Sequence, residues 1–371
     1  MKKNKVLCIG HFRESSGWSE AAKHTVLAMD YAGIDVVIRS IKLDGEDGIH
    51  PRLQELENRS TQGCDTVIQF VLPHFYEYSS VFKKNIGYFD GEGSDFHKCG
   101  WDYRTNLMDE IWVPNRRLKQ ILSKTKEVRV VHHAHDIVPY GKRYKPLIKN
   151  DSYKFYCIID FVNRKNLKGL LQAFHSEFNY RENVDMVIKL SKSGLQKDDI
   201  QQEFSKVNDE VCRKLNKHKD KRMYNEVFLL TKRLSDDGLH ALHSTCDCYV
   251  SLSHGEAWNY PLADAVFHGN ETIASNIEGH KEYIPLSSGI LINGTDEPAE
   301  GFDSIPNYQT CEDDWFVPSV NEARKAMRQK FNESQPTPGF QKLREGKSKG
   351  NRELVHQFSY SAVGNKIKEL L

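Results

Sequence analysis

Short apolar runs alternate with segments of helical spacing along most of the chain. In the first half these runs are residues 6–9, 36–39, 66–71, 110–113 and 128–132, and in the second half residues 154–159, 186–190, 227–230, 248–252 and 272–274. Short apolar runs bounded by turn residues are typical of buried strands, and strands that alternate with helices favour parallel sheets. The pattern therefore predicts an α/β chain whose strands are mostly parallel.

The length of 371 residues suggests two domains with separate hydrophobic cores. A stretch rich in proline, glycine and lysine, residues 138–152, is the best candidate linker. We expect one domain at 1–150, a second at 151–350, and a C-terminal helix in 351–371. Ligands of parallel sheets bind beyond the carboxyl ends of the strands, so the two halves should face each other across a cleft. Residues 293–314, rich in Pro, Gly, Asp and Asn, are expected to form an irregular loop.

The composition adds few constraints. Apolar residues make up 39% and charged residues 28% of the chain, and the formal net charge of +1 indicates no particular partner. No apolar run reaches the length of a transmembrane segment, and the run near the first residue is too short for a signal peptide. The eight cysteines are scattered without zinc spacing. We therefore expect reduced thiols and a cytoplasmic protein.

The most informative segment is residues 251–264, in which two carboxylates, Glu256 and Asp264, stand eight positions apart. A strand-like run precedes them, and Pro261 suits the first turn of a helix, where a missing N–H is tolerated. The loop between would expose backbone N–H groups at the positive end of a helix dipole, which favours a bound phosphate. Carboxylates beside it accept hydrogen bonds from sugar and ribose hydroxyls. The segment therefore indicates a nucleotide-sugar site.

Residues 256–265, Glu-Ala-Trp-Asn-Tyr-Pro-Leu-Ala-Asp-Ala, resemble the acidic E-x7-E signature of the retaining group 1 (glycosyltransferase family 4-like) glycosyltransferases. That signature is usually E-G-F-G-L-P-x-x-E-A. Ala257 and Asn259 replace its glycines, and Asp264 replaces its second glutamate. The resemblance implies the GT-B fold, in which two Rossmann-like domains face each other across a cleft. It also implies transfer of a sugar from a nucleoside diphosphate sugar to an acceptor hydroxyl.

The resemblance continues in order along most of the chain. Residues 8–33 are similar to the first strand, glycine loop and first helix of the family, and residues 86–117 to a late portion of its N-terminal domain. Residues 130–136, Val-Val-His-His-Ala-His-Asp, stand where many members have a histidine- or glycine-rich stretch. Residues 160–174 are similar to the R-K-N motif that opens the donor domain. The resemblance also implies that the C-terminal helix crosses back onto the N-terminal domain.

The resemblance assigns roles on the donor side. Arg164 and Lys165 would bind the diphosphate, because fixed cations stabilise the negative charge that grows on the leaving group. Glu256 would hold hydroxyls of the donor sugar and complete the catalytic set, and Asp264 would hold the ribose. Further donor contacts are expected from Ser16, Gly17, Thr231, Leu234, Ala257, Trp258, Asn259 and Tyr260. The departing phosphate would deprotonate the acceptor, with a UDP- or GDP-sugar as donor and no obligatory metal or other cofactor.

Candidates on the acceptor side come from the first half of the chain. Asp90 and Glu92 stand in a loop at the expected end of a strand, on the side where an acceptor would enter. His97 and His133 are further candidates, although a single histidine on a strand or loop is usually structural. Histidines at alternate positions of a strand do not converge easily on one ion, so we expect no metal site at residues 132–135.

Three basic runs bear on the partner, at residues 116–149, 213–222 and 342–352. Such runs are usually solvated, but along one rim they would attract DNA, an anionic membrane surface or a lipid-linked acceptor. The favoured hypothesis is a glycosyltransferase whose acceptor is a surface or envelope glycan. Two alternatives stay open: a phage-type transferase that modifies a hydroxylated base in DNA, and a non-catalytic module that binds a sugar nucleotide or a glycan.

Overall fold

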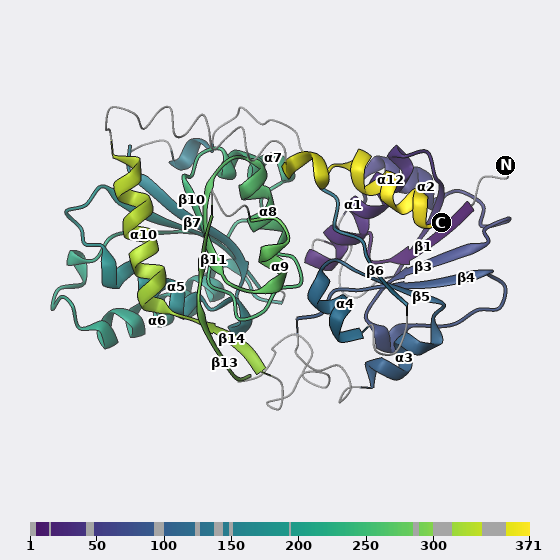
Figure 1. Ribbon diagram of the computed structural model, residues 1–371. Coiled ribbons are helices and arrows are strands. Elements are labelled where there is room, and N and C mark those ends of the chain that lie inside the picture. Colours follow the sequence, from purple (N-terminus) through teal and green to yellow (C-terminus); the bar gives the residue numbers. More distant parts are fainter. Residues whose placement is uncertain are drawn as a thin grey trace. The chain divides into compact units, whose positions relative to one another are not determined.

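The chain divides into two compact units, each of which contains segments distant in the sequence. The first unit comprises Met1–Ile137, Glu256–Tyr260 and Glu353–Leu371, and the second comprises Val138–Gly255 and Pro261–Arg352. The computed structural model (Figure 1) describes residues 5–14, 16–41, 48–92, 100–122, 127–136, 144–147, 151–192, 194–284, 289–299, 314–335 and 354–371. His97, most of the expected linker and the basic run at 342–352 lie outside the described residues.

The first unit is built on a six-stranded parallel sheet with the strand order β2-β1-β3-β4-β5-β6. Every residue of β3 and β5 is buried, as expected for strands of a parallel sheet covered on both faces. The strands are β1 Lys5–Gly10, β2 Asp35–Ser40, β3 Thr66–Phe70, β4 Lys84–Tyr88, β5 Glu110–Val113 and β6 Val128–Val130. The helices are α1 Gly17–Tyr31, α2 Pro51–Glu57, η1 Pro73–Phe75, α3 Trp101–Leu107, α4 Arg116–Leu122 and α12 Tyr360–Leu370.

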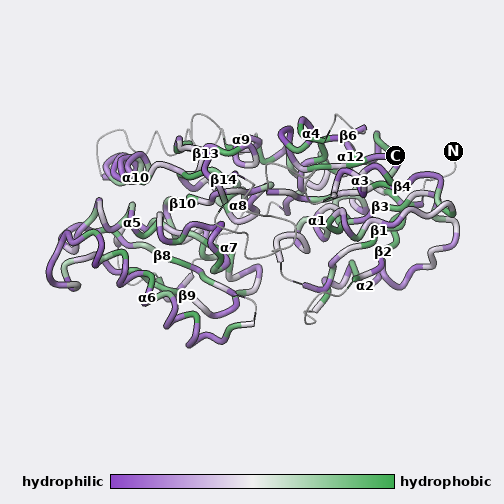
Figure 2. The backbone as a smooth tube through the Cα atoms, turned by 90° about the horizontal axis from the view of Figure 1, so that it is seen from below, coloured by the Kyte–Doolittle hydropathy of each residue, from purple (hydrophilic) through white to green (hydrophobic). Residues whose placement is uncertain are grey.

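The second unit has its own six-stranded parallel sheet, in the order β12-β11-β10-β7-β8-β9. The strands are β7 Tyr153–Asp160, β8 Val184–Ser191, β9 Val227–Leu230, β10 Cys248–Ser251, β11 Glu271–Ser275 and β12 Gly289–Ile292, and an antiparallel pair adds β13 Gly294–Pro298 and β14 Asp314–Pro318. The helices are η2 Lys145–Leu147, η3 Asn163–Lys165, α5 Leu167–Glu177, α6 Lys197–Leu215, η4 Lys221–Met223, α7 Asp236–His243, α8 Tyr260–Phe267, α9 Glu278–Lys281 and α10 Val320–Ser334. Much of α10 is hydrophilic (Figure 2), because its exposed face is rich in charged side chains.

Each sheet has a point at which the strand order reverses. In the first unit β1 pairs with β2 on one side and with β3 on the other. In the second unit β7 pairs with β8 on one side and with β10 on the other. Connections leave such a point in opposite directions, so a crevice forms at the carboxyl ends of the two central strands, and ligands of open α/β sheets bind there.

The prediction of parallel α/β structure is confirmed, and each of the ten apolar runs overlaps a strand of one of the two sheets. The apolar pattern did not reveal β4 or β12. The expected irregular loop at 293–314 was wrong in part, because β13 and the first residue of β14 fall within it. Strand β13 is exposed along its whole length, so it has no apolar face that could have indicated a strand; it is held by backbone pairing to β14.

Helix α12 packs against α1 in the first unit, in part because Gly364 has no side chain. A Cβ atom on Gly364 would lie 2.1 Å from the carbonyl oxygen of Ala28 and 2.9 Å from the Cβ of Ala32, both too close for contact. Val363 and Ile367, on the same helix, join the core cluster that contains Val26 of α1. The close approach of the two helices therefore closes this side of the first unit.

Gly364→Ala should destabilise the first unit by about 1–3 kcal/mol, the usual cost of forcing extra volume into a packed core. The measurement is the melting temperature followed by circular dichroism. Asn365→Ala, on the exposed face of the same helix, is the matched control. Equal melting temperatures for Gly364→Ala and Asn365→Ala would show that α12 does not need this close approach.

Three histidines gather in the second unit beside Asp264 of α8. His240 Nδ1 lies 3.0 Å from His268 Nε2, and the rings of His243 and His268 stack with centroids 5.2 Å apart. Burial lowers the pKa of His243 to about 3 and that of His268 to about 4, although the charge of Asp264 acts in the opposite direction. The hydroxyl of Tyr156 is hydrogen-bonded to this cluster and lies 2.7 Å from His243 Nδ1. His243 and His268 are therefore neutral in the folded protein at neutral pH.

This cluster should make the second unit less stable in mild acid. Between the folded pKa near 3 or 4 and the ordinary value near 6.5, the unfolded chain binds more protons than the folded chain, so stability falls as pH falls through that window. His268→Gln removes one titrating group and should reduce the loss of unfolding free energy between neutral pH and about pH 5 by an amount on the order of 1 kcal/mol. Calorimetric melts at both pH values measure this loss. The exposed His356→Gln is the control, and an identical pH dependence in all three proteins would contradict the assignment.

Candidate active site

A basic turn follows the central strand of the second sheet. Arg164 and Lys165 lie on η3, directly after β7, and both are half-buried. Asn166 adopts the left-handed conformation with φ 51° and caps α5 by accepting a 3.0 Å hydrogen bond from the N–H of Gly169. The turn thus presents two cations at the carboxyl end of the strand where the sheet order reverses.

Three hydrogen bonds attach this turn to the loop that follows β10. Arg164 Nη1 donates to the carbonyl of Gly255 over 2.6 Å, and the N–H of His254 donates to the carbonyl of Arg164 over 2.8 Å. Asn166 Nδ2 donates to the carbonyl of Leu252 over 2.9 Å. Because β7 and β10 are neighbours in the sheet, the basic turn and the segment that leads to Glu256 are fixed to each other, although they are about ninety residues apart.

Three further donor-side candidates, Thr231, Leu234 and Asp264, belong to this unit. Thr231 and Leu234 belong to the loop after β9, another strand of the parallel sheet. Lys189 on β8 is buried, and this burial, with a smaller contribution from the charge of Arg233 in the same loop, lowers its pKa. The sequence pattern did not indicate this lysine. Asp264 lies on α8 close to His243 and His268, whose pKa values it raises.

Residues 256–260, the first half of the acidic signature, belong to the first unit. Ala257 accepts a 2.8 Å hydrogen bond from Asn115 Nδ2 through its carbonyl, and the indole of Trp258 donates to His135 Nε2 over 2.9 Å. Asn259 has a φ of 77°, a conformation that glycine adopts freely and asparagine tolerates better than most residues. Asn259 is therefore compatible with the local backbone, as the usual glycine would be. Glu256 is buried.

The start of α1 holds the two remaining donor-side candidates. Ser16 is the N-cap of this helix, and its hydroxyl accepts a 3.2 Å hydrogen bond from the N–H of Ser19. Gly17 is exposed, and among the described residues no atom lies within 4 Å of where its Cβ would stand.

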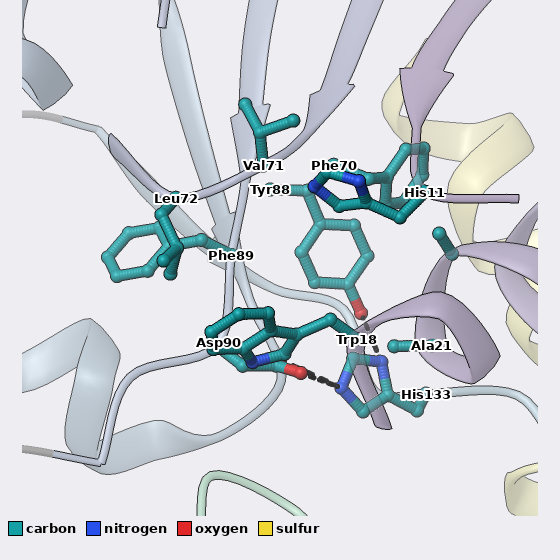
Figure 3. A pocket seen from close by; sticks show the side chains of 11 residues that line it. His11, Trp18, Ala21, Phe70, Val71, Leu72, Tyr88, Phe89, Asp90 and His133 are labelled. Atoms are coloured by element: carbon teal, nitrogen blue, oxygen red, sulfur yellow. Dashed lines mark hydrogen bonds and ion pairs between the residues drawn. The ribbon is translucent and has the colours of Figure 1, made fainter. Parts of the chain in front are cut away.

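A pocket opens where the order of the first sheet reverses (Figure 3). Its wall is mainly aromatic and aliphatic, and the polar side chains in it are His11, Asp90 and His133. The remaining lining residues are Trp18, Ala21, Ala22, Phe70, Val71, Leu72, Tyr88 and Phe89. They come from α1, from the last residues of β3 and β4, and from segments that follow β1, β3, β4 and β6, so the parallel topology gathers them at one edge.

Asp90 and His133, both predicted as acceptor-side residues, meet in this pocket. His133 Nε2 lies 2.9 Å and 3.1 Å from the two carboxylate oxygens of Asp90. His133 is only 1% exposed, whereas the Asp90 side chain is 12% exposed and so is the member of the pair that a ligand can reach. Glu92 does not line the pocket. Trp18 and Tyr88 were missed, because aromatic residues at a helix start or strand end resemble core residues in a sequence.

Among the described residues, no group of three or more His, Cys, Asp or Glu side chains is arranged to hold a metal ion. No helix among those described is both long and apolar enough to cross a membrane.

Residues 142–307 match the family model described as Glycosyl transferases group 1. Among solved structures, HepE from Anabaena in complex with UDP-glucose has a TM-score of 0.65 at 12% identity, over 99% of this chain and 98% of that chain. A sucrose-phosphate synthase from Thermosynechococcus elongatus has a TM-score of 0.67 at 13% identity, over 99% and 98%. A glycosyltransferase from Rickettsia africae has a TM-score of 0.65 at 12% identity, over 100% and 98%. No curated protein sequence matches significantly.

The structural likeness extends over nearly the whole chain and establishes the GT-B fold, although the identities are low. The family match covers the basic turn at Arg164 and Lys165 and the acidic signature from Glu256 to Asp264. Family and fold agree with each other and with the motifs. Residues 142–307 are therefore similar to the glycosyl transferases of group 1, and the chain has the GT-B fold.

Proposed function

We propose that this glycosyltransferase moves a sugar from a nucleoside diphosphate sugar, UDP- or GDP-linked, to a hydroxyl of a neutral glycan. The second unit would supply the turn that binds the diphosphate, and the first unit would supply the acceptor pocket. The observation that carries the choice of acceptor is the pocket in the first unit, where the Asp90 carboxylate, hydrogen-bonded to His133, lies in a wall of aromatic and aliphatic side chains.

The donor assignment rests on the basic turn at the reversal point of the second sheet. A diphosphate that leaves from the sugar gains negative charge, and cations held in place before the reaction stabilise it without reorganisation. Arg164 is held in place by its hydrogen bond to Gly255, and Lys165 follows it in the same turn. HepE was crystallised with UDP-glucose, which supports a sugar nucleotide as the donor class for this chain.

The acceptor assignment rests on the chemistry of the pocket wall. Sugar rings present apolar C–H faces that pack on aromatic rings such as that of Trp18, and hydroxyl groups that donate to carboxylates such as Asp90. None of the described residues that line the pocket is a lysine or an arginine. A phosphate-rich acceptor such as DNA would leave its charges unpaired there, so the pocket favours a neutral glycan over DNA.

The reaction itself would need few side-chain functions. Retention, with the departing phosphate as the group that deprotonates the acceptor hydroxyl, requires that donor and acceptor be held in reacting positions and that the leaving group be stabilised. We assign the leaving group to Arg164 and Lys165, hydroxyls of the donor sugar to Glu256, the ribose to Asp264 and an acceptor hydroxyl to Asp90. Thr231 and Leu234 would flank the base.

Lys165→Ala should lower the turnover number about a hundredfold, the scale of losing one preorganised contact with developing charge. Thermal melts with UDP, GDP, ADP and CMP first identify the nucleotide, and release of that nucleotide from its sugar conjugates then measures turnover. Lys168→Ala is the matched control, because Lys168 is exposed on α5 and pairs with Glu210. Equal turnover in the two variants would remove Lys165 from the site, and no melting shift with any nucleotide would contradict the donor class.

Asp90→Asn should lower kcat/KM for the acceptor about tenfold to a hundredfold, the value of one charge-assisted hydrogen bond, and leave the KM of the donor unchanged. Initial rates with a panel of neutral and phosphorylated glycosides measure this effect. Glu77→Gln, whose side chain is exposed on the same unit, is the control. Preference for phosphorylated acceptors, or a loss confined to the donor KM, would contradict the proposed role of the pocket.

A further inference from the structure

The buried ring of His133 has partners at both nitrogens (Figure 3). Its Nδ1 lies 3.0 Å from the hydroxyl oxygen of Tyr88, and its Nε2 lies within 3.1 Å of both carboxylate oxygens of Asp90. The Tyr88 hydroxyl in turn lies 2.6 Å from the carbonyl oxygen of Val131. The four groups form one chain from a backbone carbonyl to the pocket, and the direction of each hydrogen bond in it can be assigned.

The carbonyl at one end determines these directions. A carbonyl oxygen can only accept, so the single hydroxyl hydrogen of Tyr88 goes to Val131. Burial, and secondarily the charge of Asp90, raise the pKa of the Tyr88 phenol well above its usual value, so the hydroxyl keeps that hydrogen. The Tyr88 oxygen then offers only lone pairs to His133, and Nδ1 must donate to it. With Asp90 ionised, its carboxylate at the other end also only accepts, so Nε2 then donates as well.

The surroundings of the ring suit a positive charge. The ring of Tyr88 stacks on His133 with centroids 5.7 Å apart, and the ring of Tyr260 stacks on it at 5.4 Å. The indole of Trp258 approaches at 5.4 Å with its plane nearly perpendicular. The faces of aromatic rings attract cations at such distances, and the attraction is larger where water is excluded. The Asp90 carboxylate supplies the opposite charge in direct contact.

We propose that Tyr88 is a positioning residue that keeps His133 doubly protonated, and that this fixed imidazolium orients the Asp90 carboxylate toward the acceptor. An imidazolium has no free lone pair, so His133 cannot take the proton of an acceptor hydroxyl. Its part in the reaction is to hold Asp90, whose side chain is the more exposed of the pair. The orientation of Asp90 toward an acceptor rests on the proposed function, whereas the protonation of His133 does not.

Nitrogen-15 NMR of the protein labelled at histidine tests the protonation directly. The His133 signals are assigned by their absence in His133→Gln. At neutral pH and without ligands, both ring nitrogens of His133 should appear protonated in the unmodified protein. In Tyr88→Phe the Nδ1–H has lost its acceptor, so the ring should become neutral, with hydrogen on Nε2 alone. A neutral His133 in the unmodified protein, or an unchanged ring in Tyr88→Phe, would overturn the proposal.

Tyr76→Phe is the matched control for folding and for loss of a buried hydroxyl. Tyr76 is also buried in the first unit, and its hydroxyl has no hydrogen-bond partner among the described residues. Its removal should change neither the His133 signals nor the kinetics. Signals of His133 that change equally in Tyr76→Phe and Tyr88→Phe would show a general packing effect and reject the specific role of Tyr88.

The KM values of acceptor and donor then test the orientation of Asp90 by the imidazolium separately from the binding role of the pocket. Tyr88→Phe should raise the acceptor KM severalfold with little change in donor KM, a smaller effect than that of Asp90→Asn. If the acceptor is not a neutral glycan, the proposed function fails while the NMR result still stands. If Tyr88→Phe keeps the acceptor KM of the unmodified protein although its His133 ring is neutral, orientation of Asp90 by the imidazolium is rejected.

Discussion

The carboxyl end of the first strand in each sheet is the feature on which both candidate sites depend. Each sheet adds strands on both sides of that strand, so the chain leaves the reversal point in two directions and covers neither side of it. Between β1 and β3 this leaves the pocket that contains Asp90. Between β7 and β10 it leaves the turn of Arg164 and Lys165, tied to the loop before Glu256. One topological rule thus positions two chemically different sites.

Most of the fold could be predicted from the sequence, because buried parallel strands are short apolar runs. The apolar runs did not include β4, because Lys84, Asn85 and Gly87 interrupt its pattern, and only a strand end before Asp90 was expected there. Strand β13 was missed because it is exposed and is held by backbone pairing to β14. Asp90 and His133 could be selected one by one as polar residues at strand ends. Their contact could not be predicted, because it depends on which strands are neighbours in the sheet. Tyr88 could not be selected, because in the sequence it resembles a core residue.

The acidic signature departs from the usual motif at two glycine positions, and the structure describes what stands there. Asn259 has a left-handed backbone, a conformation that glycine adopts freely and asparagine tolerates, and Ala257 contributes its carbonyl to a hydrogen bond, which any residue could supply. Trp258 donates its indole N–H to His135. Neither replacement therefore conflicts with the local backbone of a segment that the family match covers.

The first unit includes segments on both sides of the second unit in the sequence, and this order determines which unit can finish folding first during synthesis. Val363 and Ile367 of α12 share a core with Val6 and Val26, yet they are synthesised after the whole of the second unit. The second unit is complete in sequence by residue 352, so it is the unit that can finish folding first. Until α12 is synthesised, the face of α1 that packs against it lacks its partner. The first unit therefore remains incomplete for longer than the second.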